Sequence, residues 1–223
     1  MNRLLHVSKE AKVVSLIAFL MVAVLLGGGS LVGVHTALAQ VSTSTNQTIN
    51  LTVNQTITLS LSSATLNLSS LTPGVPVSAT SSATVSTNSA TGWVMKVNRV
   101  SAASTLASSS ITFPDYTAWN STGNGNATTT DLIGANLHFR VMQTGTAAGI
   151  YSTTYWGSSD TDGAAGAKYG GFPSSSSTAT IASTSTYAGT SQVVVLKVRA
   201  DAPATQQATN YTGQITLTAI TNP

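Results

Sequence analysis

The chain of 223 residues carries few charges: 7% of its residues are charged, its formal net charge is +3, 42% are hydrophobic and none is Cys. Lys and Arg are too sparse for the basic surface that nucleic-acid binding needs, and the absence of Cys excludes disulfides. A hydrophobic core must therefore stabilise the fold, and the chain is long enough for one domain of that kind.

The first 39 residues have the features of an export signal. Three basic side chains open the segment, residues 13–26 are almost wholly apolar, and an Ala-Leu-Ala sequence ending at Ala39 offers the pattern that signal peptidase cleaves. We therefore expect a helical signal peptide over residues 1–39, followed by a polar linker over 40–47. The alternative is an uncleaved anchor over residues 13–34, and this segment is the only part expected to contact a membrane.

The linker leads into a segment that repeats itself. In NQTINLTVNQTITLSL, residues 46–61, the tetrapeptide NQTI recurs after eight residues, and apolar side chains alternate with polar ones. Such alternation is typical of a half-buried strand. We expect a strand over residues 48–61 whose apolar face is formed by Ile49, Leu51, Val53, Ile57, Leu59 and Leu61.

The same alternation occurs in five later runs, at residues 75–79, 93–97, 133–141, 194–200 and 215–219. Gly, Pro and Asn lie between these runs, and no helical period follows the signal. Many short strands separated by turn residues are typical of a sandwich or a barrel. The predicted fold is all-β, a single antiparallel β-sandwich of Greek-key or immunoglobulin-like type over residues 48–223, with a long mobile loop over about 152–190.

Trp93 is the largest side chain in a region made mostly of Ser, Thr, Ala, Gly and Asn. It alternates with Met95 and Val97, so we expect it to fill the space between two sheets. Gly92 precedes it and lets the backbone turn into the strand without a Cβ clash.

The order of these features resembles the WxL-type domain of bacterial cell-surface proteins. The residues that carry the resemblance are Gly92-Trp93-Val94-Met95, the stretch DLIGANLHF at 131–139, and the C-terminal stretch from Tyr211 to Ala219. Met95 stands where the family has Leu, and Leu217 stands where the family has its second Trp. The resemblance implies a WxL-like β-sandwich that binds peptidoglycan without a covalent link.

The inventory of reactive side chains argues against an enzyme. His138 is the sole His of residues 40–223 and falls on the polar face of its run, so we expect it to be exposed. A catalytic Ser usually needs such a base, and five Asp residues give no evident acid–base pair. No catalytic residue and no cofactor are predicted. Asp160 and Asp162 are the one candidate for a cation site, with a simple polar turn as the alternative.

Seven aromatic residues lie among Gly, Ser, Asn and Asp in loop-like stretches: Tyr116, Trp119, Tyr151, Tyr155, Trp156, Tyr169 and Phe172. They either bind a sugar or a protein partner or fold the long loop back onto the sandwich. Sequons that permit glycosylation occur at Asn46, Asn50, Asn54, Asn67, Asn120, Asn126 and Asn210.

Together these features predict a secreted, non-enzymatic structural or adhesion protein at the bacterial cell surface. We expect it to associate non-covalently with a cell-wall polymer or with other surface proteins. A second hypothesis is a self-assembling filament or pilus subunit, a homopolymer in which strand 48–61 completes the sheet of a neighbour. A third is a secreted hydrolase.

Overall fold

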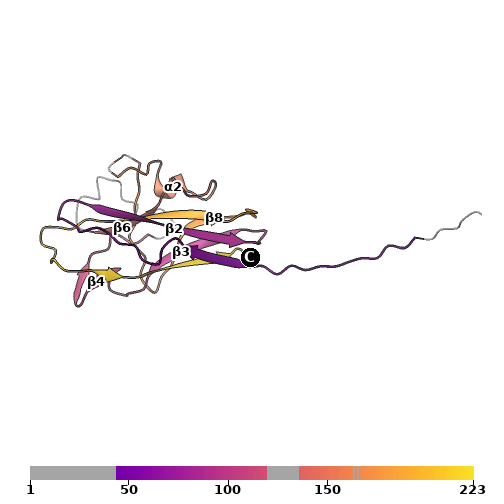
Figure 1. Ribbon diagram of the computed structural model, residues 1–223, viewed down its shortest axis with the longest axis horizontal. Helices are drawn as coiled ribbons and strands as arrows, with labels where there is room; N and C mark the ends of the chain where they lie inside the picture. The colour runs from indigo at the N-terminus through magenta and orange to yellow at the C-terminus, as the bar shows by residue number, and fades with distance from the viewer. Residues whose placement is uncertain (1–43, 120–135, 163, 165) are drawn as a thin grey trace, which may run out of the picture. The chain divides into compact units, whose positions relative to one another are not determined.

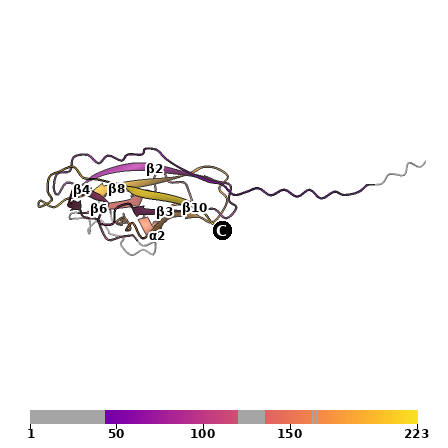
Figure 2. The same ribbon diagram turned by 90° about the horizontal axis from the view of Figure 1, so that it is seen from below.

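The computed structural model describes residues 44–119, 136–162, 164 and 166–223 (Figures 1 and 2). These residues form mostly antiparallel β-strands with almost no helix, which confirms the predicted all-β class. Residues 52–223 make one compact unit, and residues up to 51 belong to another. The predicted signal peptide lies outside the described residues. No helix within the described ranges is long and apolar enough to cross a membrane.

The largest sheet has four strands in the order β1-β2-β8-β6. Its strands are β1 (Ile57–Leu61), β2 (Val77–Thr87), β8 (Gln192–Ala200) and β6 (Leu137–Val141), and every neighbouring pair is antiparallel. Figure 1 shows β2 and β8 running side by side through the length of this sheet. The alternating runs at 75–79, 133–141 and 194–200 thus each predicted part of a strand.

A second sheet has three strands in the order β10-β3-β7. It consists of β10 (Ile215–Thr221), β3 (Trp93–Arg99) and β7 (Ala179–Thr184). A small third sheet joins β5 (Ile111–Phe113), β4 (Leu106–Ser108) and β9 (Thr212–Gly213). One short helix, α2 (Thr153–Trp156), is present among the described residues.

The inward-facing side chains of both larger sheets join one hydrophobic cluster. Trp93, Met95 and Val97 on β3 are fully buried, which confirms the predicted core position of Trp93. Alternate residues of β8 bury their side chains in the same cluster, as the period-2 pattern predicts.

The expected strand over residues 48–61 is wrong in its first half. Only Ile57–Leu61 forms a strand, while Ile49, Leu51 and Val53 are 87%, 86% and 72% exposed. The stretch expected to be a long mobile loop, over about 152–190, contains the short helix α2 and the strand β7. The β7 strand was missed because its sequence, ATIAST, is small and polar and lacks a clear apolar alternation.

Candidate functional site

Two of the four outermost strands in the larger sheets have their free edges covered by the protein's own loops. On β6, the amide of Phe139 donates to the carbonyl of Gly170 at 2.8 Å, and Gly170 donates back at 3.0 Å. On β7, the indole groups of Trp119 and Trp156 donate to main-chain carbonyls at 2.8 and 3.2 Å. These contacts leave little room for a further strand at either edge.

The edge of β1 is different, because no strand lies beside it except β2 in the described part of the chain. The amide of Ser62 donates to the carbonyl of Ser82 at 2.8 Å, and Asn88 donates to Thr56 at 3.4 Å. The even-numbered residues of this segment therefore bond to β2. Since bonded and non-bonded pairs alternate in an antiparallel ladder, the main-chain groups of residues 57, 59 and 61 point away from β2.

The edge of β10 has the same geometry. The amide of Val100 donates to the carbonyl of Gln214 at 3.0 Å, and Asn222 donates to Gly92 at 3.1 Å. The main-chain groups of residues 215, 217, 219 and 221 consequently point away from β3. Cα atoms of β1 and β10 come within 8 Å of one another, yet no ladder joins the two strands. We call the strip between β1 and β10 the seam.

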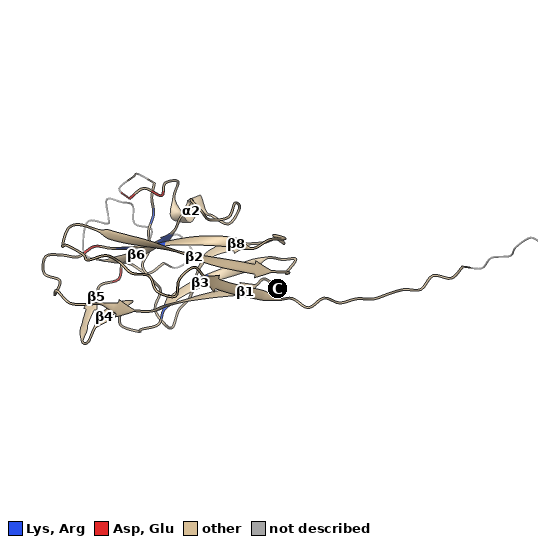
Figure 3. Ribbon diagram, viewed as in Figure 1, with Lys and Arg blue, Asp and Glu red and all other residues tan. Residues whose placement is uncertain are grey.

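The core is less completely buried along the seam than at β6. The inward-facing side chains of Ile57, Leu59, Ile215 and Leu217 are only half-buried, whereas every residue of β6 is buried. Neither seam strand contains a charged residue or a Pro, and Figure 3 shows both strands without blue or red. Natural edge strands usually carry such residues to prevent pairing with another chain. The seam therefore has the properties of an edge that is available for pairing.

The segment that precedes β1 presents an exposed apolar row. Its residues Ile49, Leu51 and Val53 repeat the spacing of the apolar residues in β1, and all three are exposed. The side chain of Asn88 ties the following residues to the end of β2: its amide nitrogen donates to the carbonyl of Asn54 at 2.9 Å, and its oxygen accepts from the amide of Thr56 at 2.6 Å.

The predicted loop aromatics mostly pack inside the protein. Trp119, Trp156, Tyr169 and Phe172 are at most 1% exposed, so they are not offered to a ligand at the surface. The ring of Phe172 stacks on Phe139 at 4.5 Å between centroids. For these four residues, the structure favours the alternative in which the aromatics fold the loop onto the sheets. The other three, Tyr116, Tyr151 and Tyr155, are half-buried, and a binding role for them remains a prediction.

The candidate cation ligands are engaged by basic side chains instead. Asp160 accepts from the guanidinium of the fully buried Arg140 at 3.0 Å, and from the amides of Gln143 and Thr144 at 2.8 and 2.7 Å. Burial pushes the pKa of Asp160 upward, but these hydrogen bonds and the charge of Arg140 outweigh burial and hold the pKa below its usual value. Asp160 is therefore the counter-ion of a buried cation.

Asp162 has a similar role at a more exposed position. It accepts from the ammonium of Lys197 at 2.7 Å and from the hydroxyl of Tyr169. Burial, together with this bond to the carboxylate, raises the pKa of Tyr169. No three acidic, His or Cys side chains within the described ranges are placed to share a metal ion.

The prediction that His138 is exposed is wrong. Its side chain is fully buried between the rings of Tyr116 and Tyr169, at 5.0 and 6.2 Å between centroids. Neither ring nitrogen has a hydrogen-bond partner. Burial, assisted by the charge of Arg199, lowers the pKa of His138 to about 4. The imidazole is thus neutral near pH 7, and no described Ser or Asp side chain is bonded to it.

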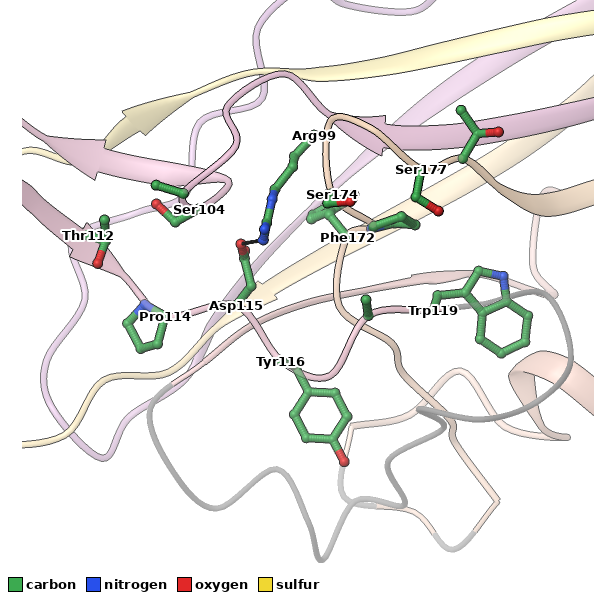
Figure 4. A pocket seen from close by; sticks show the side chains of 14 residues that line it. Arg99, Ser104, Thr112, Pro114, Asp115, Tyr116, Trp119, Phe172, Ser174 and Ser177 are labelled. Carbon is green, nitrogen blue, oxygen red and sulfur yellow. Dashed lines mark hydrogen bonds and ion pairs between the residues drawn. The ribbon is translucent and has the colours of Figure 1, made fainter.

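A pocket of about 490 Å³ opens beside the small third sheet (Figure 4). Arg99 and Asp115 form an ion pair of 2.6 Å in it, and the ring of Tyr116 points away from that pair. Asp115 also accepts from the amide of Thr105 at 2.8 Å. Among the described residues of the lining, Arg99 and Asp115 are the only charged ones, and they neutralise one another; the rest of this lining is hydroxyl, apolar and aromatic groups.

The residues that carry the WxL resemblance are spread over several elements, with 137–139 on β6 and residues 131–135 outside the described residues. Gly92, Trp93 and Met95 are buried at the start of β3, and Leu217 is half-buried on β10, where it pairs with Val97. Tyr211 is half-buried and packs edge-on against Phe113 at 5.5 Å. Trp93 and Met95 therefore belong to the core, whereas Tyr211 and Leu217 pack against its margin.

Five of the seven predicted sequons lie on described residues, and the Asn side chain is exposed in all five: Asn46, Asn50, Asn54, Asn67 and Asn210. Asn120 and Asn126 lie outside the described residues. The exposed positions are open to a glycosyltransferase, and modification remains a prediction.

Comparison with known proteins gives no relative for this chain: no family model, no curated protein and no solved structure matches it. The function must therefore be argued from the geometry described above. That geometry includes features that sequence reasoning missed, namely the role of Asn88 and the burial of Arg140. An isolated Asn after a strand has no distinctive signal, whereas a lone Arg on a clean strand could have prompted a search for a buried partner.

Proposed function

We propose that the protein is an exported, non-enzymatic β-sandwich subunit that assembles with copies of itself outside the cell. In this proposal the two larger sheets stack into a single antiparallel sandwich, and one copy gives residues 46–53 to the sheet of the next. The single observation that carries the proposal is the exposed row of Ile49, Leu51 and Val53, which repeats the pattern of β1.

Burial energetics support a partner for this row. Each apolar side chain of this size contributes about 1.5–3 kcal/mol when it is buried, and a strand added to an open edge also satisfies main-chain hydrogen bonds. Three exposed apolar residues at strand spacing are an aggregation hazard unless a specific edge receives them. A chain that exports such a segment gains stability when the segment pairs.

Other features of the chain are compatible with an exported filament subunit. The proposal requires no catalytic group, and the sole His of residues 40–223 is buried without a hydrogen-bond partner. It requires export, for which residues 1–39 supply the predicted signal. The WxL resemblance implies wall binding instead, but its residues Gly92, Trp93 and Met95 are buried.

The test is the mass of the secreted protein in solution. The full chain is expressed with its export segment in a secreting bacterial host, recovered outside the cells and studied by size-exclusion chromatography with light scattering. We expect a ladder of oligomers that resists dilution. The variant Ile49→Thr/Leu51→Thr/Val53→Thr should be a folded monomer, because the three side chains are exposed in the single copy, and it should melt below the assembled parent, because it lacks the burial that pairing provides.

The matched control is Thr48→Ser/Asn50→Ser/Thr52→Ser, which changes the polar face of the same segment and should assemble like the parent. A parent protein that remains monomeric at every concentration contradicts the proposal. If that monomer also sediments with purified cell walls, wall association replaces self-assembly as the function.

A further inference from the structure

Resting on the proposed function, the geometry points to the seam as the acceptor: we propose that residues 46–53 of one copy enter between β1 and β10 of a second copy and pair with β10. The donated strand then has the open edge of β10 on one side and the open edge of β1 on the other. The occupant is a second copy of this chain, and not an unrelated partner.

The direction of the main-chain groups favours the edges of β10 and β1 over those of β6 and β7. The outward-pointing groups of β10 belong to residues 215, 217, 219 and 221, and those of β1 belong to residues 57, 59 and 61, so both strands that border the seam have main-chain groups that their own sheets leave unbonded. The donated segment has four odd-numbered residues, 47, 49, 51 and 53, which match the four open positions on β10. The edges of β6 and β7 are already bonded to Gly170 and to two indole groups.

Side-chain phase supports the same choice. In an antiparallel pair, residues directly opposite one another place their side chains on the same face of the sheet. Ile49, Leu51 and Val53 would therefore join Ile215 and Leu217 on the inward face of β10. Those inward side chains are half-buried in the single copy, and an apolar strand in the seam would complete their burial.

The donor is expected to come from another copy because of how Asn88 holds the chain. Its side chain binds the carbonyl of Asn54 and the amide of Thr56 at the end of β2. For residues 46–53 to fold back along their own β1, the chain would have to reverse within residues 54–56. These contacts fix that short stretch to β2, so an intramolecular hairpin would have to break them.

The seam must widen to receive a strand. Neighbouring strands are about 4.8 Å apart, so a strand between β1 and β10 needs them about 9.6 Å apart, whereas their Cα atoms now approach within 8 Å. No main-chain ladder has to break for this movement, because none joins the two strands. Burial of three apolar side chains and formation of two new hydrogen-bonded ladders contribute favourable free energy, which opposes the free-energy cost of widening the seam.

The Cys-free sequence allows a direct test by cross-linking. A donor with Asn50→Cys is mixed with an acceptor that carries Thr218→Cys on the exposed face of β10, or with a control that carries Ser183→Cys on the exposed face of β7. All proteins are full chains secreted as above, with tags of different mass, and a thiol–thiol reagent spanning about 10 Å, roughly two strand spacings, is added.

We expect a heterodimer with Thr218→Cys in several-fold excess over the control, and its loss when the donor also carries Ile49→Thr/Leu51→Thr/Val53→Thr. Oligomers that form but cross-link equally or preferentially through Ser183→Cys overturn the seam as acceptor and leave self-assembly standing. The absence of oligomers from the uncross-linked parent overturns the proposed function, and with it this inference. The molar mass from light scattering on the same samples shows whether oligomers form, and so distinguishes failure of the seam as acceptor from failure of self-assembly.

Discussion

The indole nitrogen of Trp93 donates a hydrogen bond of 2.6 Å to the side-chain oxygen of Gln192. Trp93 is the first residue of β3, in the sheet β10-β3-β7, and Gln192 is the first residue of β8, in the four-stranded sheet. The bond therefore links the two sheets beside a fully buried ring. Both apolar packing and a polar anchor depend on this one side chain.

Trp93→Ala should lower the free energy of unfolding by about 3–5 kcal/mol, because it removes a fully buried indole ring from the core. Gln192→Leu keeps the ring but leaves its N–H unpaired, and should cost about 1–3 kcal/mol. Urea denaturation of the two variants measures both effects. A Trp93→Ala protein that melts within a few degrees of the parent would remove Trp93 from its central place in the core.

Gly92 should be intolerant of a side chain. Its φ is +79°, and a Cβ atom would lie 2.2 Å from the carbonyl oxygen of Thr184. Gly74 has nearly the same φ, +78°, but nothing lies within 4 Å of its Cβ position. Gly74→Ala should thus cost only the roughly 1–2 kcal/mol of left-handed backbone, and Gly92→Ala considerably more. Equal denaturation midpoints for the two variants would contradict this assignment.

Alternation of apolar residues predicted the strands that have one buried face. The runs containing Trp93, Val194 and Ile215 became β3, β8 and β10, and Gly92 has the positive φ that the predicted turn suggested. Alternation predicts that a side chain lies on an inward face, but it does not predict which other segment covers that face. For this reason it could not show that Ile49, Leu51 and Val53 are exposed.

The position of His138 is a second case in which alternation alone does not predict burial. Alternation assigns His138 to a face in contact with water, yet all five residues of β6 are buried. The second face of β6 is covered by Tyr116 and Tyr169, which come from loops far away in the sequence. Such coverage depends on the path of a long connection, and local sequence patterns do not report it.

The buried cation Arg140 should need its carboxylate. Asp160→Asn removes the counter-ion of a side chain with no exposed surface, and breaking a buried pair in this way costs about 3–5 kcal/mol. The control is Asp162→Asn, whose ion pair with Lys197 is partly exposed and whose loss should cost about 0–1 kcal/mol. Chemical denaturation at pH 7 compares them, and similar losses for both variants would argue against Arg140 as a buried charge.

His138 should make stability depend on pH between about 4 and 6.5. The pKa of His138 is lowered to about 4 in the folded protein from 6.5 in the unfolded chain. The unfolded state consequently binds more protons in this window, and stability falls as the pH drops through it, by about 3 kcal/mol in total. Asp160 has a lowered pKa, so its contribution is present above about pH 3.8 and is lost at still lower pH.

The variant His138→Phe isolates this effect, since it removes the titrating group and two unpaired nitrogens while keeping an aromatic ring between the tyrosines. Urea midpoints measured at pH 6.5 and 4.5 should differ clearly for the parent and much less for the variant. A variant with the full pH dependence of the parent would assign the dependence to other groups.

Hydrogen exchange across residues 46–53 tests the central claim most directly. In the assembled parent, the account predicts that the amides of Ile49, Leu51 and Val53 exchange slowly, because they belong to a strand in a neighbouring copy. In the monomeric Ile49→Thr/Leu51→Thr/Val53→Thr variant, the same amides should exchange at the rate of an unstructured chain, while β2 and β8 stay protected. Rapid exchange of residues 46–53 in oligomers of the parent would contradict the account.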